Sequence, residues 1–195
     1  MWDDRYSQAE FVYGTEPNDF LRDNARKIPG PDVISLAEGE GRNAVFLAGL
    51  GFNVTGVDSS RVGLDKAQRL AKVRSVKITT VQSDLADFDF GVEKFDGLVS
   101  VFCHLPTALN RSVFKMAIRS LRPGGIVVLE AYSPRQLDYG TGGPPNIELL
   151  HSVEEWKQIL DGFEFELAHE VVRMIEEGEY HKGQSSVVQI IARKP

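Results

Sequence analysis

The sequence is poor in several features that define whole classes of protein. It contains one cysteine, Cys103, so a disulfide framework and a cysteine-rich zinc site are both excluded. No apolar run approaches the roughly 20 residues that span a bilayer. The first ten residues carry acids where a signal peptide needs an apolar core. These absences predict a protein of the reducing cytoplasm that has no membrane partner.

Basic charge is also scarce. The 22 Lys and Arg residues are outnumbered by 28 Asp and Glu residues, which gives a formal net charge of −6. Non-specific binding to nucleic acid needs a basic face, so the composition argues against DNA or RNA as a partner. The histidines at 104, 151, 169 and 181 show no metal-ligand spacing, and no metal site is expected. We therefore expect one domain, residues 1–195, with a small-molecule partner; the oligomeric state stays open.

Apolar strand-like runs alternate with helical patterns along most of the chain. Strands are expected at 32–37, 52–58, 76–84, 95–105 and 126–132, and helices at 20–28, 42–51, 61–73 and 108–121. Strands that alternate with helices of this length indicate right-handed βαβ units and a parallel sheet.

The pattern changes after a loop rich in Gly and Pro at 133–146. A helix at 152–160 is expected to begin with a capping box of Ser152 and Glu155. Two strands follow, at 163–175 and 185–194, which a polar loop joins into an antiparallel hairpin. The sequence thus predicts an α/β, doubly wound, Rossmann-like fold. Its seven-stranded sheet is mainly parallel and has a C-terminal antiparallel hairpin.

The stretch LAEGEGRNA, residues 36–44, follows the first expected strand. Gly39 and Gly41 allow tight turns and a close approach of a ligand to the main chain. In an open α/β sheet, ligands bind at the carboxyl ends of the strands, which is where this loop lies. Asp58 ends the next strand, where a carboxylate can accept hydrogen bonds from ribose hydroxyls. A nucleoside is the expected ligand.

Two nucleoside cofactors compete for this site. Gly39, Gly41 and Ala44 satisfy the dinucleotide pattern G-x-G-x-x-A, with Asp58 at a suitable distance, so NAD stays an alternative. Glu38 and Glu40 would oppose a pyrophosphate, because like charges about 4 Å apart cost on the order of 4 kcal/mol at an effective dielectric of 20. S-adenosylmethionine has no phosphate and carries two positive groups. The acidic loop therefore favours S-adenosylmethionine.

The third expected strand ends in QSDLADF. Asp84 can accept a hydrogen bond from an adenine amino group, and the backbone amide of Leu85 can bind the ring. The competing interpretation is that Asp84 only caps a turn. Together with the glycine loop and Asp58, adenine recognition is favoured.

Five segments in order resemble class I S-adenosylmethionine-dependent methyltransferases: VISLAEGEGRNAVFLA, VTGVDSS, VQSDLADF, FDGLVSVFCHLP and LRPGGIVVLEAYSP. The opening WDDRYSQAEFVYGTEPNDFL is similar to small methyltransferases of the tellurite-resistance and thiopurine-methyltransferase-like group. The resemblance implies a cofactor site made by Ala37, Glu38, Gly39, Gly41, Asp58, Ser59, Asp84, Leu85, Phe102 and Cys103. In the usual family motif an acid stands at Ser35 and a glycine at Ala37. Whether Glu38 replaces that acid is left open.

The acceptor side carries weaker signals. His104 follows the fourth strand and can orient or deprotonate an acceptor, or instead bond to neighbouring main chain. Tyr13 is a candidate lid, in a segment of 30 residues expected to cap the cofactor site. Trp2 and Arg5 are expected to pack the N-terminus rather than to bind ligand. Further candidates for acceptor contacts are Arg135, Tyr139, Arg173 and His181.

We therefore expect a methyltransferase that acts on a small molecule. Family analogy narrows the acceptor to a thiol or a metalloid. An NAD-dependent oxidoreductase and a non-catalytic S-adenosylmethionine-binding protein are the alternatives.

Overall fold

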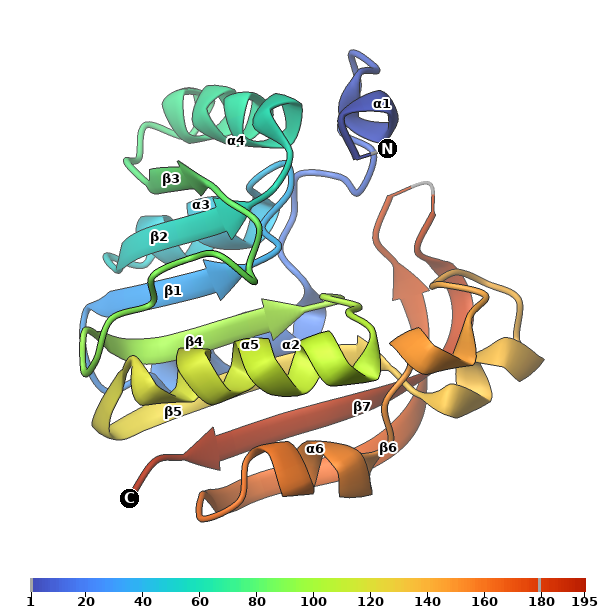
Figure 1. Ribbon diagram of the computed structural model, residues 1–195. Helices are drawn as coiled ribbons and strands as arrows, with labels where there is room; N and C mark the ends of the chain where they lie inside the picture. Colours follow the sequence, from blue (N-terminus) through green and yellow to red (C-terminus); the bar gives the residue numbers. More distant parts are fainter. Residues whose placement is uncertain (1, 179) are drawn as a thin grey trace.

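A seven-stranded sheet organises the chain in the computed structural model, which describes residues 2–178 and 180–195 (Figure 1). The strand order is β3-β2-β1-β4-β5-β7-β6. The strands are β1 (Asp32–Leu36), β2 (Asn53–Asp58), β3 (Thr79–Gln82), β4 (Phe95–Val101), β5 (Leu121–Tyr132), β6 (Glu164–Glu176) and β7 (Lys182–Arg193). Neighbouring strands from β3 to β5 are parallel, whereas β7 is antiparallel to both β5 and β6. The predicted fold class is confirmed.

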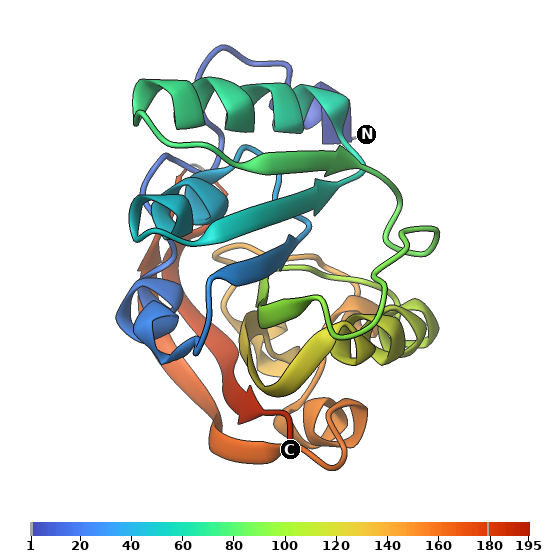
Figure 2. The same cartoon turned by 90° about the vertical axis from the view of Figure 1, so that its left-hand side faces the viewer.

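Helices cover both faces of this sheet. They are α1 (Trp2–Tyr6), α2 (Asp19–Asn24), α3 (Arg42–Gly49), α4 (Arg61–Val73), α5 (Thr107–Arg119) and α6 (Val153–Ile159). Short 3-10 turns occupy Ala25–Lys27, Pro134–Asp138 and Ile147–Leu149. Figure 2 shows α2 and α3 on one side of the twisted sheet and α5 on the other. Each side has its own apolar core, with Leu21 and Leu47 in one and Phe114 and Trp156 in the other.

Several elements differ from the sequence expectation at their ends. The predicted strand 76–84 is reduced to β3, because only four of its residues pair with the single neighbour β2. The predicted strand 126–132 starts earlier, since Leu121 pairs with Phe95 before an irregularity in the register. The predicted capping box is confirmed: Ser152 Oγ accepts from the Glu155 N–H at 3.2 Å, and Glu155 Oε2 accepts from the Ser152 N–H at 2.8 Å.

The carboxyl ends of β1, β2, β3 and β4 point to one edge of the sheet because these strands are parallel. β4 ends at Val101, and Phe102 turns the chain out of the sheet with a left-handed φ of 52°. The loops that follow these strands form one wall of the site described below. Within the described residues, no helix is long and apolar enough to cross a membrane.

Candidate functional site

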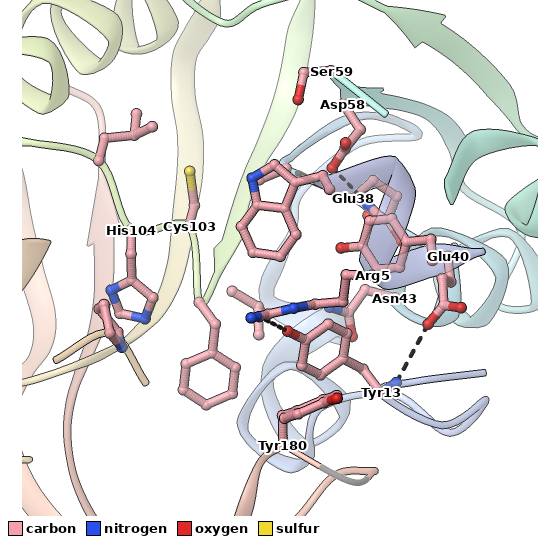
Figure 3. A pocket seen from close by; sticks show the side chains of 18 of the residues that line it. Arg5, Tyr13, Glu38, Glu40, Asn43, Asp58, Ser59, Cys103, His104 and Tyr180 are labelled. Carbon is pink, nitrogen blue, oxygen red and sulfur yellow. Dashed lines mark hydrogen bonds between the residues drawn. The ribbon is translucent and has the colours of Figure 1, made fainter. Parts of the chain in front are cut away.

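A cavity of about 560 Å³ lies at the carboxyl ends of the parallel strands (Figure 3). Its volume is within the range of small-molecule pockets. Nine of the ten predicted cofactor residues line it: Ala37, Glu38, Gly39, Asp58, Ser59, Asp84, Leu85, Phe102 and Cys103. Figure 3 shows Asp58 and Ser59 on one side, Cys103 and His104 on the other, and Arg5 against Tyr13 below them. The topology therefore brings segments far apart in sequence into one site.

The tenth predicted residue, Gly41, is not among the lining residues. It precedes the first residue of α3 with a φ of 92°, and a Cβ there would lie 2.5 Å from the Cβ of Ala67. Gly41 thus lets α3 start in close contact with α4. Gly39 does line the cavity, and Ala37 holds a φ of 49°, a conformation that suits the glycine found there in the usual family motif.

Asp58 is fixed by backbone hydrogen bonds. Its Oδ2 accepts from the Gly39 N–H at 2.9 Å and its Oδ1 accepts from the Ser60 N–H at 2.8 Å. Burial raises the pKa of Asp58, while these hydrogen bonds favour the carboxylate. Each oxygen retains a lone pair that can accept a further hydrogen bond. The side chain is therefore prepared to bind hydroxyl groups at the end of β2.

Glu40 is not a free acid in the glycine loop. Its Oε1 lies 2.5 Å from the Lys66 Nζ, and both side chains are almost fully buried. Its Oε2 accepts from the Tyr13 N–H at 3.3 Å, and Lys66 also donates to the Glu10 carbonyl at 2.6 Å. Glu40 therefore ties the N-terminal segment to α4. The sequence-based idea that its charge repels a pyrophosphate is wrong, because Lys66 neutralises that charge.

Glu38 caps the helix that follows the loop. Its Oε1 accepts from the Ala44 N–H in the first turn of α3 at 2.8 Å. Its Oε2 is buried and has no hydrogen-bond partner within residues 2–178 and 180–195. Burial raises the pKa of Glu38 to about 7. The loop is consequently much less acidic at neutral pH than its sequence indicates, and the electrostatic case against NAD is weaker.

Asp84 performs the turn-capping role that the sequence left open. Its Oδ1 accepts from the Ala86 N–H at 2.9 Å, and the side chain also lines the cavity. Its second oxygen is the one left for a ligand. Leu85 is buried beside it.

His104 combines the two roles considered from sequence. Its Nδ1 lies 3.2 Å from the Leu149 carbonyl oxygen, which can only accept, so Nδ1 carries the proton. Burial lowers the pKa of His104 to about 4, and the ring is neutral at pH 7. The Nε2 therefore presents a lone pair, and no described residue bonds to it. This atom can accept a proton or a hydrogen bond.

His104 belongs to a group of five rings that we call the aromatic cluster: Tyr13, Phe102, His104, Tyr132 and His181. The Phe102 centroid lies 4.7 Å from that of Tyr132 and 4.5 Å from that of His181. The Tyr13 and His181 centroids are 4.6 Å apart, and those of His104 and Tyr132 are 5.5 Å apart. The cluster thus brings together three of the predicted acceptor-side residues, His104, Tyr13 and His181.

The N-terminal helix α1 contributes residues that sequence reasoning set aside. Trp2 and Arg5 line the cavity rather than only packing the N-terminus. Arg5 Nη1 donates to the Tyr13 hydroxyl at 2.9 Å, and its guanidinium lies 5.1 Å from the Trp2 ring centroid and 5.0 Å from that of Tyr180. Asp3 holds α1 in place by accepting from Ser60 Oγ at 2.5 Å. Five-residue α1 was too short to show a helical pattern.

Three predicted acceptor-side residues lie away from the cavity. Arg135 is exposed and pairs with Glu170 at 3.3 Å, and Tyr139 is also absent from the lining. Arg173 is occupied by carboxylates, with its Nη2 at 2.5 Å from Glu130 and 2.8 Å from Glu177. The fourth such residue, His181, lines the cavity.

Arg42 and Asn43 also line the cavity but were missed from the sequence. Arg42 Nη2 donates to Glu177 Oε2 at 2.5 Å, which joins the start of α3 to the end of the β6–β7 hairpin. Asn43 Oδ1 accepts from the Asn18 N–H at 3.0 Å. The sequence signal that could have identified Arg42 and Asn43 as cavity residues is their position directly after the glycine loop.

Proteins that are named methyltransferases share sequence with this chain. Residues 33–125 match the model of a methyltransferase domain. An uncharacterized methyltransferase of Synechocystis is 38% identical over 103 residues, which are 52% of this chain and 47% of that protein. One from Bacillus subtilis is 30% identical over 121 residues, 62% of this chain and 48% of that protein. The chain spans about half the length of these curated relatives.

Solved structures share the fold. TehB from Haemophilus influenzae superposes with a TM-score of 0.76 at 20% identity, over 100% of this chain and 66% of that one. A structure reported for the conversion of a disulfide bond into a thioacetal group during echinomycin biosynthesis superposes with a TM-score of 0.77 at 18% identity, over 98% and 87% of the two chains. At such identities the likeness concerns the fold alone. Together, the matched domain, the relatives and the fold support a class I methyltransferase with S-adenosylmethionine as its cofactor.

Proposed function

We propose that this protein transfers the methyl group of S-adenosylmethionine to a small-molecule acceptor. One observation carries the proposal: a carboxylate fit for ribose hydroxyls, Asp58, and a neutral histidine with a free lone pair, His104, line the same cavity. The chain thus offers a nucleoside site and a group that can orient or deprotonate an acceptor.

In this proposal each part of the cofactor has a place in the cavity. Asp58 and Ser59 hold the ribose, Asp84 and Leu85 hold the adenine, and the loop of Ala37 and Gly39 holds the methionyl part, with Glu38 behind it. Phe102 and Cys103 lie beneath. Burial raises the pKa of the Cys103 thiol to about 12, so this thiol is inert and only fills space.

The cofactor, when bound, supplies a methyl group that is already activated on a sulfonium. The chain's own residues then have to align the acceptor and receive its proton. We assign this second task to His104, whose Nδ1 is held by the Leu149 carbonyl while Nε2 faces the acceptor. Tyr13 closes the same end of the cavity.

The weak basicity of His104 favours an acceptor that ionises easily. With its pKa near 4, His104 is a poor base for an alcohol or an ammonium group. A thiol can give its proton to such a weak base, and a soft metalloid anion has no proton to lose. The resemblance to the tellurite-resistance and thiopurine-methyltransferase-like group supports the same acceptors, as does the sulfur chemistry reported for one structural neighbour. We propose a thiol or metalloid acceptor.

The setting follows from the composition. With a net charge of −6 and one cysteine, we propose a cytoplasmic enzyme that acts without nucleic acid. We also propose that residues 1–30 act as the cap of one domain, because Trp2, Arg5, Tyr6 and Tyr13 line the cavity.

Two measurements test the proposed function. Isothermal titration with S-adenosylhomocysteine and with NADH distinguishes a methyltransferase from an oxidoreductase, and binding of NADH alone would refute our proposal. Turnover of S-adenosylmethionine labelled in its methyl group, with a panel of thiols, tellurite and selenite, then distinguishes an enzyme from a non-catalytic binder.

The sheet already disfavours NAD, because β7 is inserted antiparallel between β5 and β6.

A further inference from the structure

A buried polar network adjoins the acceptor end of the cavity. It joins two carboxylates, two guanidinium groups and one amide, which belong to Asn18, Arg42, Glu130, Arg173 and Glu177. Asn18 precedes α2, Arg42 begins α3, and Glu177 directly follows β6. Asn18 and Glu130 have no exposed surface, and Glu177 is 6% exposed. The network therefore ties together segments that are far apart in sequence.

The Glu130 carboxylate anchors this network in the sheet. Its Oε1 accepts from Asn18 Nδ2 at 2.7 Å and from Arg173 Nη2 at 2.5 Å. Its Oε2 accepts from Arg173 Nε at 3.1 Å and from Gln189 Nε2 at 2.5 Å. A carboxylate has about four lone-pair sites, so these bonds fill Glu130. Its part in the network is to hold Arg173 and Asn18 in place.

Glu177 connects the network to the cavity. Its Oε1 accepts from Asn18 Nδ2 at 2.9 Å and from Arg173 Nη2 at 2.8 Å, and its Oε2 accepts from Arg42 Nη2 at 2.5 Å. Its backbone N–H donates to the His181 carbonyl at 2.8 Å. Arg42 and His181 both line the cavity. Glu177 thus fixes two cavity residues at once, one through its side chain and one through its main chain.

The charges of the network balance only while Glu177 is ionised. Arg42 and Arg173 supply two positive charges, and Glu130 and Glu177 supply two negative charges. Arg173 also lies 3.5 Å from Asp19, whose side chain is 51% exposed and therefore screened by water. Without the Glu177 charge, two guanidinium groups would share one buried carboxylate. Since Glu177 lies between the two arginines, its loss would drive the end of β6 away from the start of α3.

The residues next to Glu177 in the β6–β7 connection, 178, 180 and 181, form what we call the hairpin tip, and this tip contacts the N-terminal segment. A Cβ at Gly178 would lie 2.3 Å from the Val12 carbonyl oxygen, so the two main chains are in close contact. The His181 ring centroid lies 4.6 Å from that of Tyr13 and 4.5 Å from that of Phe102. A displacement of the hairpin tip would therefore take His181 away from the aromatic cluster.

We propose that Glu177 is a positioning residue that holds the hairpin tip, and with it His181, at the acceptor end of the cavity. Within the described residues Glu177 is not part of the cavity lining, so it acts through Arg42 and through its own main chain. The inference rests on the proposed function, to which it adds a residue that orders the acceptor site. Its direct consequence concerns the His181 ring and can be observed without any ligand.

Protonation of His181 reports where the hairpin tip lies. The titratable or charged groups around its ring are Arg5 on α1, Tyr13, Arg42 on α3, His104 after β4, Tyr132 on β5 and Arg173 on β6. Burial lowers the pKa of His181 well below its ordinary value of 6.5, and the nearby positive charges lower it further. Glu177→Gln makes the network more positive, which by itself lowers this pKa again. If the tip instead leaves the cavity, water solvates the imidazolium and the pKa rises toward 6.5.

The first arm of the test measures this pKa by NMR of the histidine rings in the protein without ligand. The signal of His181 is assigned by its absence in His181→Asn. We expect a neutral ring at pH 6 in wild type and a mostly protonated one in Glu177→Gln. Glu176→Gln, an equal charge change at the exposed neighbouring position, is the matched control and should keep the ring neutral.

A second variant guards against a single variant that does not fold. Glu177→Gln combined with Arg42→Gln removes one charge of each sign and leaves Arg173 paired with Glu130. Burial is the largest cause of the lowered pKa of His181, so a tip that stays in place keeps the ring neutral at pH 6 in this variant too. A protonated ring is expected here as well.

The second arm compares turnover with cofactor affinity in Glu177→Gln. Methyl transfer to the panel of thiols, tellurite and selenite should fall at least about 10-fold, because a small misplacement of the acceptor side slows the reaction. The dissociation constant of S-adenosylhomocysteine should change less than about threefold, since Asp58 and Gly39 keep their contact.

The outcomes are distinguishable from failure of the proposed function. A wild type that binds S-adenosylhomocysteine but transfers no methyl group contradicts that function and leaves the His181 measurement to decide the role of Glu177. The inference is overturned if His181 stays neutral at pH 6 in both variants. It is also overturned if turnover falls by a smaller factor than expected, or if cofactor affinity falls as much as turnover does.

Discussion

The Lys66 ammonium lies 2.5 Å from the Glu40 carboxylate, and their side chains are only 1% and 2% exposed. Removing one partner leaves the other charge unpaired in a medium that hardly solvates it. We expect Lys66→Met to lower the free energy of unfolding by about 3–5 kcal/mol. The double variant Lys66→Met, Glu40→Gln should recover much of this loss. Urea unfolding at pH 7 measures both, and a double variant no more stable than the single one would contradict a buried ion pair.

Glu38 should make stability depend on pH. Burial raises the pKa of Glu38 in the folded chain to about 7, above its ordinary value of 4.5, so the folded chain binds more protons between these values. The contribution of Glu38 to the free energy of unfolding is therefore fully present below pH 4.5 and is lost as pH rises through 7. We expect the unfolding free energy of Glu38→Gln relative to wild type to increase by on the order of 3 kcal/mol from pH 4.5 to pH 8.

Denaturant unfolding at a series of pH values measures this difference. Glu154→Gln, at an exposed position of α6, is the matched control. A Glu38→Gln curve parallel to that of wild type would mean that the pKa of Glu38 is the same in the folded and the unfolded chain.

Asp58→Ala should remove most of the affinity for the cofactor. The loss of hydrogen bonds to a charged group costs about 1.5–3 kcal/mol, and we expect the dissociation constant of S-adenosylhomocysteine to rise at least about 10-fold. Isothermal titration gives the value. Asp65→Ala, an exposed acid paired with Arg61 on α4, should bind like wild type. If Asp58→Ala binds S-adenosylhomocysteine as tightly as wild type, then Asp58 does not bind the ribose.

His104→Asn should separate catalysis from cofactor binding. The asparagine amide can still donate to the Leu149 carbonyl, but the lone pair of Nε2 is lost. We expect kcat to fall about 100-fold and the dissociation constant of S-adenosylhomocysteine to change little. His169→Asn is the control, because His169 lies on β6 and bonds to Gln189. Full activity in His104→Asn would mean that His104 only holds its loop to the Leu149 carbonyl and takes no part in catalysis.

Alanine should have opposite effects on stability at two glycines, Gly41 just before α3 and Gly49 at its end. At Gly41 a Cβ would lie 2.6 Å from the Ala67 Cα at a φ of 92°, so Gly41→Ala should destabilise by about 2 kcal/mol or more. At Gly49 a Cβ meets nothing within 4 Å, so Gly49→Ala should stabilise by about 0.5–1 kcal/mol. Thermal unfolding of the pair checks both signs.

The sequence supports the fold better than the site. Alternating apolar runs and helical patterns are local, which is why the parallel sheet and the capping box of Ser152 were predictable. Side-chain pairing is not local. With 28 acids and 22 bases available, no pattern indicates that Glu40 pairs with Lys66 or that Arg42 reaches Glu177. The supposed acidity of the loop was wrong for this reason.

Burial explains the other differences. The sequence shows that Glu38 and His104 exist, but not that they are shut off from water, and their pKa values follow from that enclosure. The role of Arg5 was missed because a helix of five residues has no periodicity to detect.

The matched methyltransferase segment, residues 33–125, excludes much of the cavity's acceptor end. Arg5 and Tyr13 come before that segment, and Tyr180 and His181 come after it. If the proposed function holds, we expect chimaeras that exchange only the opening residues and the tip of the last hairpin to change which molecule is methylated and to keep the same cofactor.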